Sequence, residues 1–377
     1  MNAKKAEQPK RKYRVLCLDG GGMRGTYTAT YLADVARTFA KRRGVESIDI
    51  GAAFDLIVGT STGGIIACAL AKGIPLQEVV TLYRRHGKEI FSRPMPAKRR
   101  QLPGDIIRRP AALEKGEAAL RAALQDRLGD TTVGGIFENR GIALAISAVE
   151  MSQHRSWLFR TAHFPDSSGR DDNYSLVDVC LATSAAPVFR SMAEVDHPKG
   201  RGSDGYNVFV DGGLWANNPV LVGLIEALKV TSAEDEIHVF SMGSCPRPAG
   251  EHVGRGQSNR GLPNWKFGAD AASLSIDAQE FAFDNMARML LPHLDRECRI
   301  VRFPSEKVPA ALVPYLGLDD TREEAADALV NQAHHDADMT NSRCSKPDEE
   351  AALICDLFES APELTDPLVS RRDMSPA

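Results

Sequence analysis

The sequence has few aromatic residues and no long apolar run. Aromatic side chains make up 6% of its 377 residues. The longest stretch without a charged residue, from Leu56 to Ala71, is interrupted by glycine and threonine, and it is shorter than the roughly 20 apolar residues of a membrane-spanning helix. The first fourteen residues are polar and basic and contain no apolar segment, so we expect no secretory signal there.

Cysteine is scarce, and the net charge is small. The seven cysteines form no C-x-x-C pair and lie mostly in apolar stretches, which is typical of reduced core thiols. A net charge of −4, from 46 basic and 50 acidic residues, argues against a dedicated nucleic-acid-binding protein. A chain of this length buries a core without help from metals or disulfides. We therefore expect a soluble cytoplasmic protein with no metal and no cofactor.

Strands, glycine turns and helices alternate in the N-terminal half. A buried strand is predicted over Tyr13–Leu18, followed by a glycine cluster and a helix that ends near Arg43. A second strand, Phe54–Val58, is followed by Gly59–Gly63 and a helix that ends near Gly73. This repeated order indicates right-handed βαβ units and a mainly parallel sheet.

The rest of the chain is predicted in less detail. The stretch from Arg93 to Arg109, with six basic residues and one acid, indicates a loop or lid that is either merely solvated or in contact with anionic headgroups. Helices are expected over roughly 117–128, directly after this stretch, and over 265–291 and 322–339, and a surface loop over 247–264. Further strands are expected at 143–149, 157–161, 208–210, 237–241 and 299–303.

The first functional motif is rich in glycine. Asp19-Gly20-Gly21-Gly22-Met23-Arg24-Gly25 lies at the first strand-to-helix junction. Glycines allow a sharp turn and bring backbone N–H groups close to a ligand, and the following helix N-terminus favours negative charge. The motif also satisfies G-x-G-x-x-G, so a dinucleotide-binding protein is an alternative. That alternative requires an acid at the end of the next strand, whereas Glu46 and Asp49 precede it.

Two further motifs contain a candidate nucleophile and a candidate base. Gly59-Thr60-Ser61-Thr62-Gly63 matches G-x-S-x-G between a strand and a helix, which is the setting of a nucleophile elbow. Asp211-Gly212-Gly213 follows the strand Val208–Val210. An activated serine needs an adjacent base, and chemistry alone leaves a histidine open as that base. Four histidines lie near candidate strands: His154, His163, His197 and His238.

Taken in this order, the three motifs resemble those of the patatin-like phospholipase family. The resemblance runs from Tyr13 to about Gly243 and includes Ala182–Phe189 and Ser241–Gly243. It implies a three-layer α/β/α patatin-like fold with a mainly parallel central sheet. We expect a flexible basic arm over residues 1–12, a catalytic core over 13–243, and a helical extension over 244–377 that packs on the core as a candidate regulatory region.

The same resemblance implies the roles of the motif residues. Ser61 would be the nucleophile and Asp211 the base of a Ser–Asp dyad that needs no metal. Backbone N–H groups of Gly21 and Gly22 would hold the oxyanion, and Arg24 would add charge or brace the loop. The motif is supported by further glycines: Gly20, Gly25, Gly59, Gly63, Gly212 and Gly213.

Substrate and regulation also follow from resemblance. The family implies membrane phospholipid as the substrate, attacked by a peripheral enzyme at the inner membrane surface. A patatin-like core with a large helical extension is similar to bacterial anti-phage effectors activated by a cyclic dinucleotide, so we expect such an activator and no nucleic-acid polymer as partner. Three alternatives remain: an unregulated carboxylesterase on the same fold, the dinucleotide-binding protein, and a silent ligand sensor. The oligomeric state is left open.

Overall fold

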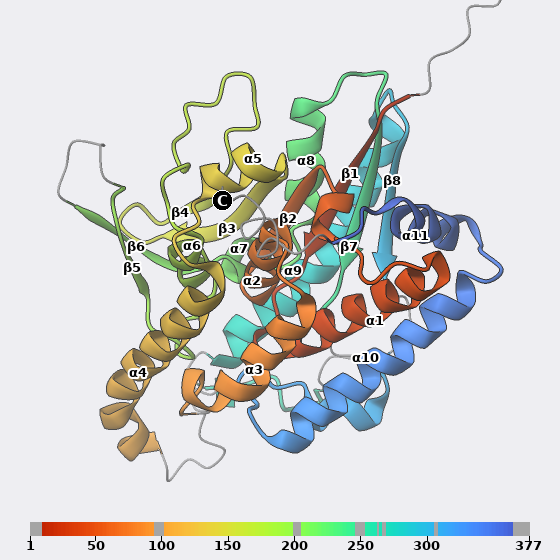
Figure 1. The fold of residues 1–377 in the computed structure, drawn as a ribbon. Helices are drawn as coiled ribbons and strands as arrows, with labels where there is room; N and C mark the ends of the chain where they lie inside the picture. Colours follow the sequence, from red (N-terminus) through yellow and green to blue (C-terminus); the bar gives the residue numbers. More distant parts are fainter. Residues whose placement is uncertain are drawn as a thin grey trace, which may run out of the picture.

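An eight-stranded, mostly parallel sheet runs through the computed structural model (Figure 1). Its strands lie in the order β5-β6-β3-β2-β1-β7-β8, and β4 pairs with β3. The strand bounds are β1 Lys12–Leu18, β2 Leu56–Thr60, β3 Ala143–Glu150, β4 Arg155–Arg160, β5 Ala193–Asp196, β6 Tyr206–Asp211, β7 Glu236–Met242 and β8 Cys298–Phe303. The structure describes residues 10–93, 102–198, 205–245, 253–261, 264–265, 269–304 and 308–364.

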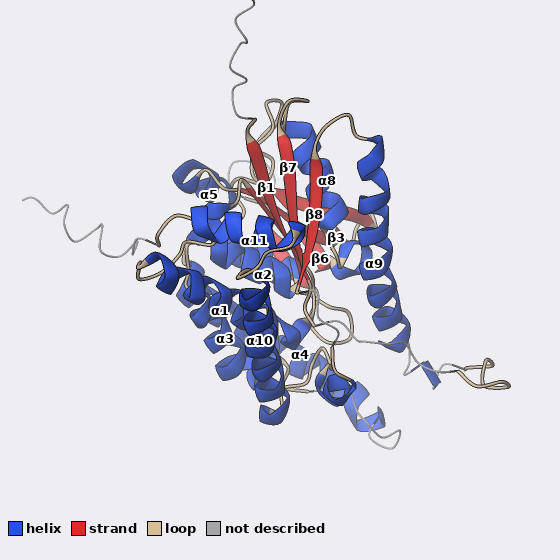
Figure 2. Ribbon diagram, turned by 90° about the vertical axis from the view of Figure 1, so that its right-hand side faces the viewer, coloured by secondary structure: helices blue, strands red, loops and turns tan. Residues whose placement is uncertain are grey.

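Helices cover both faces of the sheet, which confirms the predicted three-layer fold (Figure 2). On one face lie α1 Gly25–Arg43, α2 Thr62–Lys72, α3 Leu76–Ile90, α10 Glu323–Arg343 and α11 Glu349–Ser360. On the other lie α8 Val220–Val230 and α9 Ala269–Leu290. Alternate residues of β1 face the two cores, Leu16 and Leu18 toward one and Val15 and Cys17 toward the other. Burial on both faces explains why this strand is an unbroken apolar run in the sequence.

The structure corrects the prediction of a basic loop or lid over Arg93–Arg109. Residues 94–101 lie outside the described part, but α4 runs over Leu102–Leu128, so the second half of Arg93–Arg109 is helical. Proline and basic residues favoured a loop in the sequence. Pro103 is tolerated in the first turn of the helix, where its missing N–H has no acceptor to lose, and Pro110 lies inside the helix.

Other differences are small. The edge strand β5 was not predicted, because four residues are too short for a clear alternating pattern. The short helices α5 Val133–Arg140, α6 Leu176–Thr183 and α7 Gly213–Ala216 were likewise not singled out. Residues 1–9 of the predicted arm lie outside the described part. Within 247–264, residues 253–261 form neither helix nor strand.

The helices after residue 243 contact the N-terminal helices through buried polar groups. Tyr27 Oη of α1 donates a 2.6 Å hydrogen bond to Asp336 Oδ2 of α10. One turn further along, Tyr31 and Thr340 share a 2.7 Å hydroxyl–hydroxyl bond. These bonds fix α10 along the helix that directly follows the glycine-rich loop. Among the helices of the described residues, none combines the length and apolarity needed to cross a bilayer.

Candidate active site

Sheet register brings the second and third motifs together. Strand β4 pairs with residues 145–150 of β3, so β2 and β6 must share the other edge of β3. Thr60 at the end of β2 pairs with Ser147, and Asp211 at the end of β6 pairs with the next residue, Ala148. Since β2 and β6 run toward each other along this edge, the residues at their ends must meet.

Ser61 occupies a sharp turn between β2 and α2. Its backbone has φ 53° and ψ −123°, a sparsely populated conformation that costs on the order of 1–3 kcal/mol and is typical of functional sites. The Ser61 N–H donates a 2.8 Å hydrogen bond to Thr183 Oγ1. Space for the turn depends on Gly59, where an added Cβ would lie 2.5 Å from the carbonyl oxygen of Gly63. The strained turn holds the serine side chain at the carboxyl end of the sheet.

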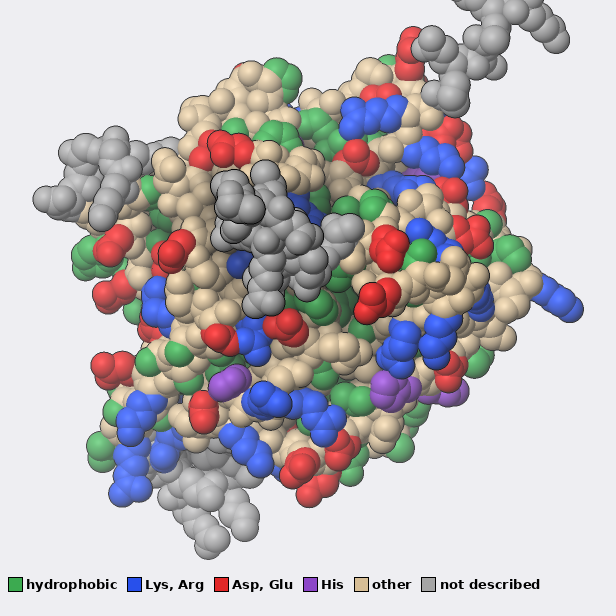
Figure 3. All heavy atoms as spheres, in the orientation of Figure 1, with side chains coloured by type: hydrophobic (Ala, Val, Ile, Leu, Met, Phe, Trp, Pro, Cys, Tyr) green, Lys and Arg blue, Asp and Glu red, His purple; other side chains and the backbone are tan. Residues whose placement is uncertain are grey.

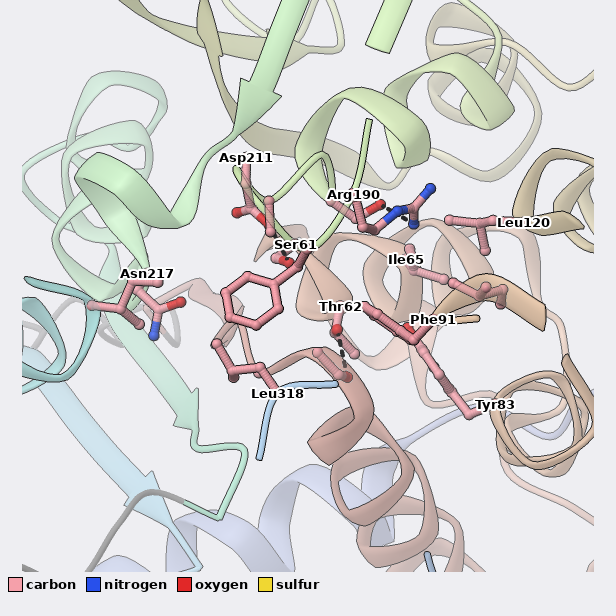
Figure 4. Close-up of a pocket in the computed structure, with 17 residues that line it drawn as sticks. Ser61, Thr62, Ile65, Tyr83, Phe91, Leu120, Arg190, Asp211, Asn217 and Leu318 are labelled. Atoms are coloured by element: carbon pink, nitrogen blue, oxygen red, sulfur yellow. Dashed lines mark hydrogen bonds between the residues drawn. The ribbon is translucent and has the colours of Figure 1, made fainter. Parts of the chain in front are cut away.

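Asp211 accepts a hydrogen bond from the serine hydroxyl. The distance from Ser61 Oγ to Asp211 Oδ2 is 2.7 Å, and Gly213 N–H donates to Oδ1, also at 2.7 Å (Figure 4). Burial raises the pKa of Asp211 to about 6. The two hydrogen bonds and the charge of Arg190 act in the opposite direction. A carboxylate of this pKa is a stronger base than an ordinary aspartate, as proton abstraction near neutral pH requires.

The glycine-rich loop presents two free backbone donors. Gly20 N–H is bonded to Asn217 O at 3.0 Å, and Met23 N–H to Leu318 O at 2.9 Å. Between them, the N–H groups of Gly21 and Gly22 have no acceptor in the described part of the chain. Both glycines line the same pocket as Ser61. Two adjacent free donors beside a nucleophile have the form of an oxyanion hole.

Arg24 braces this loop from behind. Its side chain is buried, and its Nε and Nη1 donate to the carbonyl oxygens of Gly21 and Cys245, each at 3.3 Å. Arg24 is not among the residues that line the pocket around Ser61. Of the two roles expected for this residue, the geometry therefore favours bracing over direct contact with an oxyanion.

The pocket has an apolar side and a polar side. The empty space among its lining atoms, open solvent at its mouth included, is about 590 Å³, of which about 50 Å³ is roomy enough for the centre of a water molecule. The polar lining includes Ser61, Asp211, Asn217 and also Arg190, which lies next to Leu120 in Figure 4, and the Asn217 Nδ2 donor is buried without a partner among the described residues. The apolar side is formed by Ile65, Tyr83, Ile90, Phe91, Leu120 and Phe189. Such a pocket accommodates an apolar chain with a polar reacting group at one end.

Sequence reasoning missed several lining residues. Asn217 follows the Asp211-Gly212-Gly213 motif, and Thr183, which accepts the Ser61 N–H without lining the pocket, lies in the segment Ala182–Phe189. No local pattern marks the role of either residue. Arg190 directly follows one of these segments. Leu318 belongs to the C-terminal region and reaches the pocket only through tertiary packing (Figure 4). No sequence signal places it beside Ser61.

The histidine alternatives lie elsewhere. No histidine lines the pocket in the described residues. His163 contacts Thr161 and Glu226, and His197 contacts Asn207. These contacts give the two histidines structural partners away from Ser61.

The dinucleotide alternative also lacks its acid. Strand β2 leads directly into Ser61, with no carboxylate to bind a ribose. Asp49 precedes this strand and is bound by Arg140 Nη2 at 2.7 Å. The described residues contain no group of three His, Cys, Asp or Glu side chains placed to hold a metal ion.

Asp19, the first residue of the glycine motif, supports the loop from the sheet. Arg302 Nη2 donates to Asp19 Oδ2 and to Glu280 Oε1, each at 2.6 Å, and Arg302 Nη1 donates to Ser241 Oγ at 2.9 Å. The Asp19 side chain is fully buried. This cluster ties the end of β1 to β8 and α9, outside the pocket that contains Ser61.

Comparison with known proteins gives one family. Residues 16–224 match the family model described as patatin-like phospholipase. A cGAMP-activated phospholipase of Pseudomonas aeruginosa is 35% identical over 280 residues, which are 74% of this chain and 75% of that protein. A cGAMP-activated phospholipase of Vibrio cholerae is 34% identical over 233 residues, 60% of this chain and 61% of that protein. The solved structure of human GIVD cytosolic phospholipase A2 aligns at 9% identity with a TM-score of 0.43, over 92% of this chain and 60% of that chain.

Proposed function

The chain belongs to the patatin-like phospholipase family, and from that premise we propose that it is a serine phospholipase with Ser61 as nucleophile and Asp211 as base. One observation carries the proposal: Ser61 Oγ donates a 2.7 Å hydrogen bond to Asp211 Oδ2. Around this pair lie two free backbone donors and an apolar wall. Nucleophile, base and oxyanion donors are the parts that acyl transfer needs.

The proposed reaction proceeds through an acyl-enzyme. As Ser61 Oγ attacks the ester carbonyl carbon, its proton passes to Asp211 Oδ2, and the N–H groups of Gly21 and Gly22 stabilise the oxyanion. The intermediate collapses, the C–O bond to the glycerol oxygen breaks, and that oxygen takes the proton from Asp211. Water then attacks the acyl-serine and gives a proton to Asp211. The bond from the acyl carbon to Ser61 Oγ breaks, Ser61 Oγ takes the proton back from Asp211, and a fatty acid is released.

The substrate is proposed to be a membrane phospholipid, attacked by the enzyme as a peripheral protein. The apolar side of the pocket suits an acyl chain, because contact with Ile65, Phe91 and Leu120 replaces the lipid surroundings of that chain. The ester at its end would then lie beside Ser61 on the polar side.

We further propose that a cyclic dinucleotide activates the enzyme and that residues 244–377 act as the regulatory region. The names of the Pseudomonas and Vibrio relatives support such an activator. Contacts between this region and the core support its regulatory role. Leu318 O accepts a hydrogen bond from Met23 N–H, next to the proposed oxyanion donors, and α10 is hydrogen-bonded to α1. A ligand that binds one arrangement of these helices more tightly shifts the population toward it.

Labelling with a fluorophosphonate probe tests the proposed nucleophile. Only an activated serine reacts, so the wild-type protein should carry one adduct, located on Ser61 by peptide mass spectrometry. Ser61→Ala should abolish the adduct and Asp211→Ala should slow its formation on the order of 100-fold or more. An adduct on another serine, or none in the presence of cGAMP, would contradict the proposal and favour a silent ligand sensor.

A further inference from the structure

The pocket around Ser61 contains a buried guanidinium to which no carboxylate of the described residues is bound. Arg190 is 6% exposed and lines the pocket together with Ser61 and Asp211 (Figure 4). Among the described residues, the only group bonded to its side chain is the hydroxyl of Ser184, 3.3 Å from Nη1. A guanidinium has five N–H donors, so most of its hydrogen-bonding capacity is unused by the protein.

A buried charge without a bound counter-ion is costly. Burial lowers the pKa of Arg190 to about 10, although Glu117, Tyr83 and Asp211 oppose that change. None of these three groups is hydrogen-bonded to the guanidinium. The side chain therefore remains a cation whose unused donors can be satisfied by an anion entering the pocket.

The position of this cation is fixed relative to the nucleophile. Thr183 Oγ1 accepts the Ser61 N–H, and the next residue, Ser184, accepts from Arg190. Ser184 Oγ itself donates to Cys180 O at 2.7 Å, which leaves its lone pairs for the guanidinium. These two hydrogen bonds tie the nucleophile and the cation to neighbouring residues of one segment, and both line the same pocket, in which the guanidinium extends toward Leu120 (Figure 4).

We infer that Arg190 forms an anion subsite for the phosphodiester of the lipid whose ester lies at Ser61, so that the enzyme selects phospholipids over neutral glycerolipids. This inference rests on the proposed phospholipase function. In a phospholipid only a few glycerol bonds separate the phosphate from the ester carbonyls, so one pocket can hold both. A planar guanidinium suits a phosphate because it donates two parallel hydrogen bonds to two oxygens.

The arginine of the glycine motif does not offer the same site. Arg24 directs its guanidinium to the carbonyl oxygens of Gly21 and Cys245 and is absent from the lining of the pocket. Of these two arginines, only Arg190 combines burial, free donors and a place in the pocket beside Ser61.

A pair of matched substrates tests the subsite. Wild-type protein and the Arg190→Gln and Arg190→Lys variants are assayed with cGAMP on a phospholipid and on diacylglycerol with the same acyl chains. Arg190→Gln should lower kcat/KM on the phospholipid on the order of 100-fold, as expected for losing a buried charged contact, mainly by raising KM. On diacylglycerol the change should stay within about threefold, and Arg190→Lys should keep part of the phospholipid activity.

Control variants separate recognition from folding. Arg140→Gln removes a part-buried arginine that binds Asp49 outside the pocket, and it should leave the ratio of the two activities unchanged. Fluorophosphonate labelling of Arg190→Gln at the wild-type rate shows that the dyad is intact. Inorganic phosphate distinguishes a lipid phosphate from a free anion as the ligand of this subsite. If phosphate inhibits diacylglycerol hydrolysis by wild type but not by Arg190→Gln, and wild type shows no preference between the two lipids, the subsite binds a free anion. That result would overturn its role in recognising the lipid.

Two other results overturn the inference, and they are distinguishable. If Arg190→Gln loses equal activity on both lipids, or wild type does not prefer the phospholipid, Arg190 is not a phosphate subsite and the proposed hydrolase stands. If wild type hydrolyses neither lipid with cGAMP present, the proposed function fails and the subsite fails with it.

Discussion

Alanine substitutions at Gly22 and Gly44 distinguish the cost of a strained backbone from the cost of crowding by an added side chain. Both have left-handed backbone, with φ +56° at Gly22 and +69° at Gly44. A Cβ on Gly22 would collide with the carbonyl oxygen of Leu318, whereas a Cβ on Gly44 would meet nothing within 4 Å. Gly44→Ala should lower the free energy of unfolding by only ~1–2 kcal/mol, the left-handed penalty, and leave activity intact.

Gly22→Ala should have the larger effect on both properties. The added methyl group pushes the loop away from Leu318 and displaces the donors of the proposed oxyanion hole, so turnover should fall on the order of 100-fold or more. Chemical denaturation and steady-state kinetics of the two variants provide the comparison. Equal losses of stability and activity in both would show that crowding at Leu318 does not matter.

The pH dependence of hydrolysis should follow Asp211. Burial raises the pKa of this base to about 6, so kcat/KM should fall as the pH drops through about 6 and Asp211 becomes protonated. A pH profile on an uncharged ester substrate measures this limb without titrating the substrate. A profile that is flat down to pH 4.5 would mean that Asp211 is not the base.

The same group makes stability depend on pH. The pKa of Asp211 is about 6 in the folded state, above the ordinary value of 3.8. The folded state therefore binds the proton more tightly than the unfolded state does. Stability is lost as the pH rises from about 4 to about 6. Asp211→Asn removes this charge. It should raise the free energy of unfolding by up to about 3 kcal/mol above pH 6 and hardly change it below pH 4. Denaturation of both proteins at pH 4 and pH 8 checks the sign.

Residue roles were predictable from sequence where a local context marks them. Both residues were predicted to follow a strand, Ser61 between Gly59 and Gly63 and Asp211 before Gly212 and Gly213, and the structure places them in contact. Arg190 and Leu318 had no such signature. Their approach to Ser61 depends on how distant elements pack, which a pattern of neighbouring residues does not contain.

At the scale of elements, Arg302 connects three parts of the fold. It lies on β8 and binds Asp19 after β1 and Glu280 on α9. Arg302→Gln leaves the buried Asp19 carboxylate without its partner, which should destabilise the protein by ~3–5 kcal/mol. Arg299→Gln, on the same strand but with exposed partners, should hardly change stability. Similar melting temperatures for the two variants would contradict a role of this cluster in fixing the glycine loop.

Strands of the parallel core were predictable because burial on both faces makes them continuous apolar runs. Of helix α4, the second half was predicted, but the first half was not, because prolines and arginines dominate it in the sequence. The docking of α4 against α3 and α6 is a tertiary effect that overrides this local composition. The antiparallel strands β4 and β6 were found, but not that β6 shares an edge of β3 with β2. That shared edge is what brings Asp211 to Ser61.

At the scale of the whole molecule, the net charge is small, −4 over 377 residues. Acidic and basic side chains are intermingled over the face shown in Figure 3, as the near balance of 46 basic and 50 acidic residues suggests. A surface of this kind gives no strong field of one sign. On this face, then, nothing competes with the proposed role of Arg190 in the pocket as the group that selects a phosphate-bearing lipid.

The proposed activation by a cyclic dinucleotide also belongs to the scale of the whole molecule. We expect low basal hydrolysis that rises with one cyclic dinucleotide, for which cGAMP is the first candidate. A hundredfold rise requires ~2.7 kcal/mol of preference for the active state. Because such a ligand binds the folded protein, the melting temperature should rise with its concentration. High basal activity that no cyclic dinucleotide changes would contradict the proposed regulation and leave the hydrolase proposal standing.

The most direct test of the central claim is fatty-acid release from phospholipid vesicles in the presence of cGAMP. Four proteins are compared: wild type, Ser61→Ala, Asp211→Ala and the double variant. The account predicts release by wild type alone, with the double variant hardly less active than either single variant, since residues that act as one unit are strongly non-additive. Release that persists in Ser61→Ala, or that survives largely intact in Asp211→Ala, would contradict the assignment of the dyad.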